Sequence, residues 1–79
     1  MHLQFAWNRD SPVPVFIQIE QDIRRKILSG HIKHGERLPR ETVLAEQYGA
    51  SRVTIRRALE ELAAANLVVR RHGIGTIAT

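Results

Sequence analysis

The stretch AEQYGASRVTIRRALEEL, residues 45–62, decides the fold that we expect of this chain. Ala45 and Gly49 are four residues apart, and Ile55 follows six residues later. A small residue at 45 lets two helices approach, and glycine at 49 makes the tight turn between them. Ile55 then packs the second helix onto the first. The spacing therefore predicts a helix-turn-helix.

The helix expected after Ser51, running to about Ala65, carries its charges in an unfavourable order for an isolated helix. Its N-terminal half holds three arginines, Arg52, Arg56 and Arg57, and two glutamates follow. The helix dipole disfavours cations at this end by about 0.3–1 kcal/mol each. In a helix-turn-helix, however, this end meets the DNA major groove, where arginines face phosphate oxygens and guanine edges. The arginines therefore indicate a DNA-facing helix.

Pairing within the helix is the structural alternative for these arginines. Arg56 could pair with Glu60, and Arg57 with Glu61, each four residues along the helix. In both pairs the arginine precedes the glutamate, which is the weaker order, worth at most about 0.2–0.5 kcal/mol. Arg52 has no acid three or four residues along, so this alternative explains it least.

A β-hairpin is expected after this helix, over residues 67–78 (LVVRRHGIGTIA). β-Branched residues open the segment and favour a strand, and a second short strand can return after the turn. Gly73 and Gly75 let the backbone of the tip come close to another surface. Basic side chains flank this tip: Arg70, Arg71 and His72. The pattern predicts a basic wing that reaches along the DNA backbone or into the minor groove, while the alternative is a hairpin that only closes the domain.

The rest of the chain completes one small domain, residues 14–79, preceded by an extended segment over residues 1–13. Alternating apolar residues indicate the extended segment: Leu3, Phe5 and Trp7. Helices are expected over residues 14–29 and 41–48, with Pro14 in the first helical position. An apolar stripe marks the buried face of the first helix: Phe16, Ile19, Ile23 and Ile27. Left-handed residues should follow the three helices: Gly30, Gly49 and Asn66.

The composition limits the classes of function. The 79 residues carry a net charge of +4, and residues 52–79 hold five arginines against two glutamates. Such a one-sided basic surface indicates a polyanionic partner. The sequence has no cysteine, and no apolar run approaches the roughly 20 residues of a membrane span or has the form of a signal peptide. We therefore expect a cytoplasmic protein that needs no cofactor.

Taken together, residues 14–76 resemble the N-terminal DNA-binding domain of the GntR family of bacterial transcription regulators. The motifs that carry the resemblance are RLP (37–39), LA (44–45), SR.T.R.AL..L (51–62) and RR.G.GT (70–76). The resemblance implies a mostly α winged helix-turn-helix, with three helices plus a small β-hairpin as the wing. It also implies sequence-specific binding of double-stranded DNA by a regulator, usually a repressor, with residues 52–65 in the major groove and the wing, 70–76, at the backbone or minor groove.

The resemblance carries roles onto individual residues. Arg52 and Arg56 match the recognition-helix arginines of the family. Ser51 and Thr54 match its phosphate-binding hydroxyls, and the wing tip is matched by His72, Gly73 and Gly75. The full set of DNA-binding residues that we expect is Arg40, Thr42, Ser51, Arg52, Thr54, Arg56, Arg57, Arg71, His72, Gly73, Gly75 and Thr76.

The start of the second helix departs from the family pattern. Where the family usually has Ser-Glu-Arg, this chain has Arg40, Glu41 and Thr42. The helix-capping serine is therefore lost, at a cost of about 1 kcal/mol, and a DNA-facing arginine has become threonine. We expect Arg40 to supply a replacement phosphate contact.

The resemblance also implies partners. Members of the family normally carry a C-terminal domain that binds an effector metabolite and dimerises. We therefore expect a homodimer on palindromic operator DNA in a full-length form, and an effector only where such a sensor domain exists. On this basis the chain is either a fragment or a domain without its sensor.

Two other classes of function are weaker alternatives. A protein-binding winged helix would be favoured by an acidic or apolar exposed helix, and the arginines argue against it. An enzyme is not supported, because no serine–histidine–acid set can be argued and the chain has no cysteine. His31, His34 and Glu36 have a spacing that could hold a metal, but on a short connector they are more simply polar loop residues.

Overall fold

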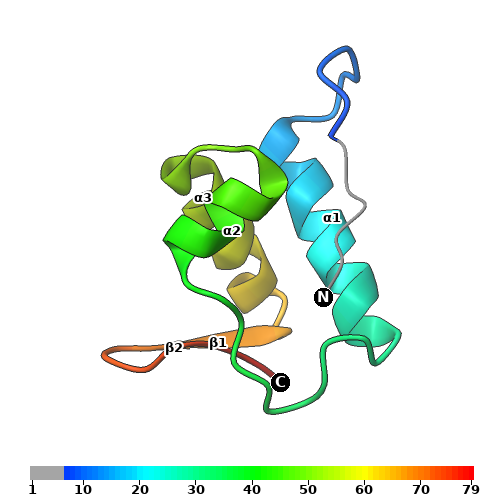
Figure 1. The fold of residues 1–79 in the computed structure, drawn as a ribbon. Helices are drawn as coiled ribbons and strands as arrows, with labels where there is room; N and C mark the ends of the chain where they lie inside the picture. The colour runs from blue at the N-terminus through cyan, green and yellow to red at the C-terminus, as the bar shows by residue number, and fades with distance from the viewer. Residues whose placement is uncertain (1–6) are drawn as a thin grey trace.

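Three helices and one hairpin make up the fold in the computed structural model, which describes residues 7–79 (Figure 1). The elements are α1 (Val15–Leu28), α2 (Glu41–Tyr48), α3 (Arg52–Ala64), β1 (Val68–Arg71) and β2 (Gly75–Ala78). The helices gather around one core, and the hairpin extends below α2 and α3 with its tip projecting past them. None of the helices within the described residues is long and apolar enough to cross a membrane.

α1 packs against α3 and closes one side of the core. Ile19 and Ile23, from the predicted apolar stripe, are almost completely buried. The carbonyl of Pro14 accepts hydrogen bonds from the N–H groups of Ile17 and Gln18, so Pro14 is the N-cap residue of α1. The prediction that it is the first helical residue is wrong by one position. At the other end Gly30 has a φ of +82°, which confirms the left-handed residue after the helix.

The turn between α2 and α3 has the predicted geometry. Gly49 is left-handed, with φ +64° and ψ +37°, and the N–H of Ala50 donates to the carbonyl of Ala45 at 3.0 Å. Ser51 caps α3, because its Oγ accepts a hydrogen bond from the N–H of Thr54 at 3.1 Å. The helix-turn-helix is therefore confirmed, together with the cap that begins its second helix.

β1 and β2 pair as an antiparallel hairpin, and we call residues 68–78 the wing. Its register pairs Val68 with Ala78 and Arg71 with Gly75. The segment between α1 and α2, residues 31–39 (the connector), pairs with the inner edge of the wing. There the N–H of Leu38 donates to the carbonyl of Thr76 at 2.9 Å. Three helices with a wing anchored in this way form a winged helix-turn-helix, which confirms the predicted fold class.

The segment before α1 differs from the extended structure that we predicted. Residues 8–13 form turns, in which the Asn8 side chain accepts from the N–H of Asp10 and Ser11 Oγ accepts from the N–H of Val13. Trp7 holds this segment to the helix-turn-helix, because its Nε1 donates to the carbonyl of Tyr48 at 2.9 Å. Leu3 and Phe5 lie outside the described residues.

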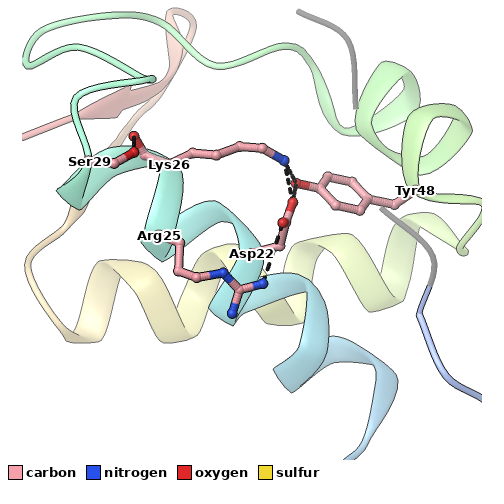
Figure 2. A network of polar contacts seen from close by, with 5 residues as sticks. All are labelled: Asp22, Arg25, Lys26, Ser29 and Tyr48. Atoms are coloured by element: carbon pink, nitrogen blue, oxygen red, sulfur yellow. Dashed lines mark hydrogen bonds and ion pairs between the residues drawn. The ribbon is translucent and has the colours of Figure 1, made fainter. Parts of the chain in front are cut away.

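A polar network joins α1 to the end of α2 (Figure 2). The hydroxyl of Tyr48 donates to Asp22 Oδ2 at 2.7 Å, and Lys26 pairs with the same carboxylate. Burial, together with the hydrogen bond and the charge of Asp22, raises the pKa of Tyr48 well above its ordinary value, so the phenol stays a donor. The network is accounted for by this helix-to-helix contact, and it lies apart from the arginine-lined surface described below.

Candidate nucleic-acid interface

An open groove of about 920 Å³ lies between the start of α2, the start of α3 and the wing. Five arginines line it: Arg37, Arg40, Arg52, Arg70 and Arg71. Glu41 is the one carboxylate that lines the groove within the described part of the chain. α3 and the wing, the two elements that the sequence predicts to face DNA, therefore border the same cationic surface.

Arg52 begins α3 and is exposed at the border of the groove. No ion pair joins its guanidinium to another group in residues 7–79. Beside it, the hydroxyls of Ser51 and Thr54 lie 2.8 Å apart and hydrogen-bond to each other. A cation at the positive end of the helix dipole is unfavourable in the free domain, so Arg52 is the arginine that folding explains least.

Arg56 has a partner outside its own helix. Its Nη2 donates to Glu41 Oε1 at 3.1 Å, and Arg70 Nη2 donates to Glu41 Oε2 at 2.6 Å. Pairing of Arg56 with Glu60 was the structural alternative, and the contact with Glu41 replaces it. One carboxylate at the start of α2 thus connects α3 to β1, and it holds two arginines at fixed positions beside the groove.

The two arginines also determine the ionisation of Glu41. Burial raises the pKa of this carboxyl, but the hydrogen bonds and charges of Arg56 and Arg70 outweigh burial and lower the pKa below its ordinary value. A carboxylate with a lowered pKa stabilises the folded state above its unfolded-state pKa, and that stabilisation is lost as the pH falls through the folded-state pKa.

We therefore expect Glu41→Gln to change the pH dependence of stability. The variant should be less stable than the native chain near pH 7, by up to about 1 kcal/mol because the pairs lie at the surface. The difference should shrink below about pH 4.5, the region in which an unperturbed glutamate takes up its proton. Urea unfolding at a series of pH values measures this, and a constant difference across the acidic range would contradict it.

Arg57 is held on the other side of α3. Its guanidinium carbon lies 4.1 Å from the centroid of the Phe16 ring, so the side chain stacks on α1 instead of pairing with Glu61. A cation–π contact of this kind contributes about 0.5–1 kcal/mol at an exposed site. Arg57 therefore has a structural role in the free domain, and its predicted contact with DNA stays a prediction.

The start of α2 carries the departure from the family pattern. Arg40 is the N-cap residue, but its side chain makes no capping hydrogen bond, as the loss of serine implies. Arg40 and Thr42 are both exposed and both line the groove. Their positions are compatible with the phosphate contacts that the sequence predicts.

The wing tip is exposed at Arg71, His72 and Gly73, as its predicted role requires. Thr76 is different, because it is only 8 % exposed and its carbonyl accepts the hydrogen bond from Leu38 that anchors the wing. Thr76 nevertheless lines the groove, so it shapes the wing and its predicted contact with DNA stays a prediction.

Two groove arginines were missing from the predicted set, Arg37 and Arg70. Arg37 pairs with Ile77 in an isolated bridge beside β2, and Leu38 next to it is buried. Neighbouring residues in an extended segment point to opposite sides. The expected burial of Leu38 could therefore have indicated that Arg37 points outward. The pairing of Arg70 with Glu41, 29 residues earlier, has no comparable local signal.

The spacing that could have held a metal does not form a site. Within residues 7–79, no three histidine, aspartate or glutamate side chains come together as a cation site. Glu36 is engaged locally, because its carboxylate accepts a hydrogen bond from the N–H of Lys33 at 2.9 Å.

Comparison with known sequences agrees with this geometry. A family model described as "Bacterial regulatory proteins, gntR family" matches residues 17–77. The histidine utilization repressor of Klebsiella aerogenes is 44% identical over 68 residues, which cover 86% of this chain and 28% of the relative. The transcriptional repressor NagR of Bacillus subtilis is 39% identical over 69 residues, with 87% and 28% covered. The chain thus spans little more than a quarter of the length of these relatives.

Solved structures resemble the whole fold. AraR(DBD) in complex with operator ORX1 superposes with a TM-score of 0.89 at 29% identity, and the match covers 100% of this chain and 99% of that one. YtrA from Sulfolobus acidocaldarius, a GntR-family transcription factor, has a TM-score of 0.84 at 25% identity, with 91% and 76% covered.

Proposed function

Because this chain belongs to the gntR family of bacterial regulatory proteins, we propose that it binds double-stranded operator DNA in a sequence-specific manner and represses transcription. α3 enters the major groove, and the wing lies along the backbone or in the minor groove. The observation that supports this most is the groove between the two elements, lined by five arginines and one carboxylate. The likeness to AraR(DBD), which was solved on an operator, supports it independently.

Within this proposal the exposed residues divide into two groups. Arg52 and Arg56 contact base edges, because guanine O6 and N7 accept two hydrogen bonds from one guanidinium. The residues that contact phosphate and sugar are Arg37, Arg40, Thr42, Ser51, Thr54, Arg57, Arg70, Arg71, His72, Gly73, Gly75 and Thr76. Such contacts fix the position of the domain on the duplex but carry no sequence information.

The proposal extends to the assembly and the setting. The matched region makes up 28% of each of the two repressors compared above, so the proposal for the assembly concerns a full-length form. In that form a homodimer binds a palindromic operator, and an effector metabolite modulates binding only where a C-terminal sensor domain exists. The protein acts on DNA in the bacterial cytoplasm and has no enzymatic activity.

A salt titration tests the DNA-binding function directly. The logarithm of the association constant for a mixed-sequence duplex should fall linearly with the logarithm of salt concentration, with a slope near −0.9 for each phosphate contacted. Several basic groups border the groove, so we expect a slope of about −3 or steeper. Fluorescence anisotropy with a labelled duplex measures it.

Arg25→Ala serves as the control in this titration. Arg25 is exposed on α1, with 68% of its side chain accessible, and it lies outside the groove. Its removal lowers the net charge by one but should leave the slope unchanged. Binding that does not respond to salt, or a slope that responds equally to Arg25 and to the groove arginines, would contradict the proposal.

A further inference from the structure

Val53 is the exposed apolar residue at the centre of the outward face of α3. Its exposed fraction is 69%, equal to that of Leu28 at the end of α1. At roughly 100° per residue, position 53 lies on the side of the helix opposite the buried stripe. That stripe consists of Ile55, Ala58, Leu59 and Leu62. Val53 is therefore the side chain that a surface approaching α3 would meet first.

The two neighbouring arginines leave Val53 uncovered. Arg56 and Arg57 lie three and four residues further along, so their side chains share its face. Arg56 is drawn to one side, towards Glu41 of α2, and Arg57 to the other side, over Phe16 of α1. The isopropyl group consequently stands between two positive charges that are held apart by their own contacts.

Folding gives no reason for valine at this position. An exposed helical position favours long unbranched residues, and valine is a weaker helix former than arginine, lysine or glutamine. Val53 also contributes nothing to the core, since it points away from the buried stripe. A contact outside the domain is the remaining explanation.

The flanking charges determine which partner fits. One arginine on each side of Val53 favours a polyanion as the partner. The isopropyl group itself cannot make hydrogen bonds, so it requires an apolar feature on that partner. The apolar feature that the major groove of DNA offers is the C5 methyl group of thymine. We propose that Val53 is a specificity-determining residue that packs on a thymine methyl group between the phosphate or guanine contacts of Arg56 and Arg57. The inference rests on the proposed function.

Replacement of thymine by deoxyuridine tests the contact, because it deletes one methyl group and leaves base pairing intact. The probe is a duplex selected by the native chain from a randomised library, with each thymine replaced in turn. At one thymine position per half-site, the native chain should bind the deoxyuridine duplex about fourfold more weakly than the thymine duplex. This is the loss expected when one methyl group that the contact buries is deleted. Val53→Ala should bind the thymine and deoxyuridine duplexes equally at that position.

Leu28→Ala is the matched control, because it truncates an equally exposed apolar residue at the end of α1, outside the arginine-lined groove. It should keep the native thymine preference, and thermal melts should show both variants at least as stable as the native chain. Identical thymine preferences in the native chain and Val53→Ala, with tight binding retained, would overturn the role of Val53 alone. Failure of the native chain to enrich any duplex would overturn the proposed function and this inference with it.

Discussion

Replacement of Gly49 by valine is expected to lower the free energy of unfolding by more than about 2 kcal/mol. Gly49 sits at φ +64°, in the left-handed region, at the turn that joins α2 to α3. An L-residue in this region loses roughly 1–2 kcal/mol, and a β-branched residue loses more. A domain of 79 residues has a total stability of only about 4–12 kcal/mol, so the variant should lose a large share of it.

The reason for this loss is the backbone and not the available space. A Cβ added at Gly49 would meet Trp7 Nε1 at 4.0 Å and no closer atom, which is ordinary contact. Gly49→Asn is therefore the informative control, because asparagine tolerates the left-handed region. Urea unfolding should show a small loss for asparagine and a large one for valine. Equal losses in the two variants would show that the turn does not depend on φ.

Gly49 also shows which parts of the fold the sequence could predict. Its φ, the left-handed Asn66 and the Ser51 cap each depend on a few neighbouring residues, and all three were confirmed. The turns over residues 8–13 were missed although they are local. There the side chains of Asn8 and Ser11 accept hydrogen bonds from backbone N–H groups two residues further along. The apolar alternation that indicated an extended segment ends before them, at Trp7.

The candidate site was harder to predict than the fold, because its contacts are not local. Glu41 binds Arg56 across 15 residues and Arg70 across 29 residues. Arg70 reaches Glu41 because the wing folds back beside α2. The spacing of these residues in the sequence does not predict this contact. The burial of Thr76 has the same origin, since the connector covers it from a distant part of the chain.

This network changes what the arginine variants should do to the free domain. Arg52 has no ion-pair partner within residues 7–79, so Arg52→Ala should leave stability unchanged or raise it slightly by relieving the helix dipole. Arg56→Ala removes a surface pair with Glu41 and should cost up to about 1 kcal/mol. Both variants should remain folded, so their DNA binding can be measured without ambiguity.

Loss of either recognition arginine is expected to weaken binding to a selected duplex by about 5- to 150-fold, equivalent to about 1–3 kcal/mol. The same variants should also relax the sequence preference at one base pair per half-site, because a bidentate contact with guanine is lost. Arg40→Ala should behave differently. Arg40 is exposed at the N-cap of α2, where a phosphate contact would weaken all duplexes alike and make the salt slope shallower by about one unit.

The contrast between these variants separates base reading from general attraction to the phosphates. Binding across a duplex library at two salt concentrations supplies both quantities for Arg52→Ala, Arg56→Ala and Arg40→Ala. If all three variants shifted the salt slope and none changed the sequence preference, α3 would be held on the backbone and would read no base. If Arg52→Ala destabilised the free domain and left DNA binding intact, the arginine would serve the fold. DNA binding therefore explains the unfavourable charge at the start of α3 only if Arg52→Ala binds DNA poorly and remains as stable as the native chain.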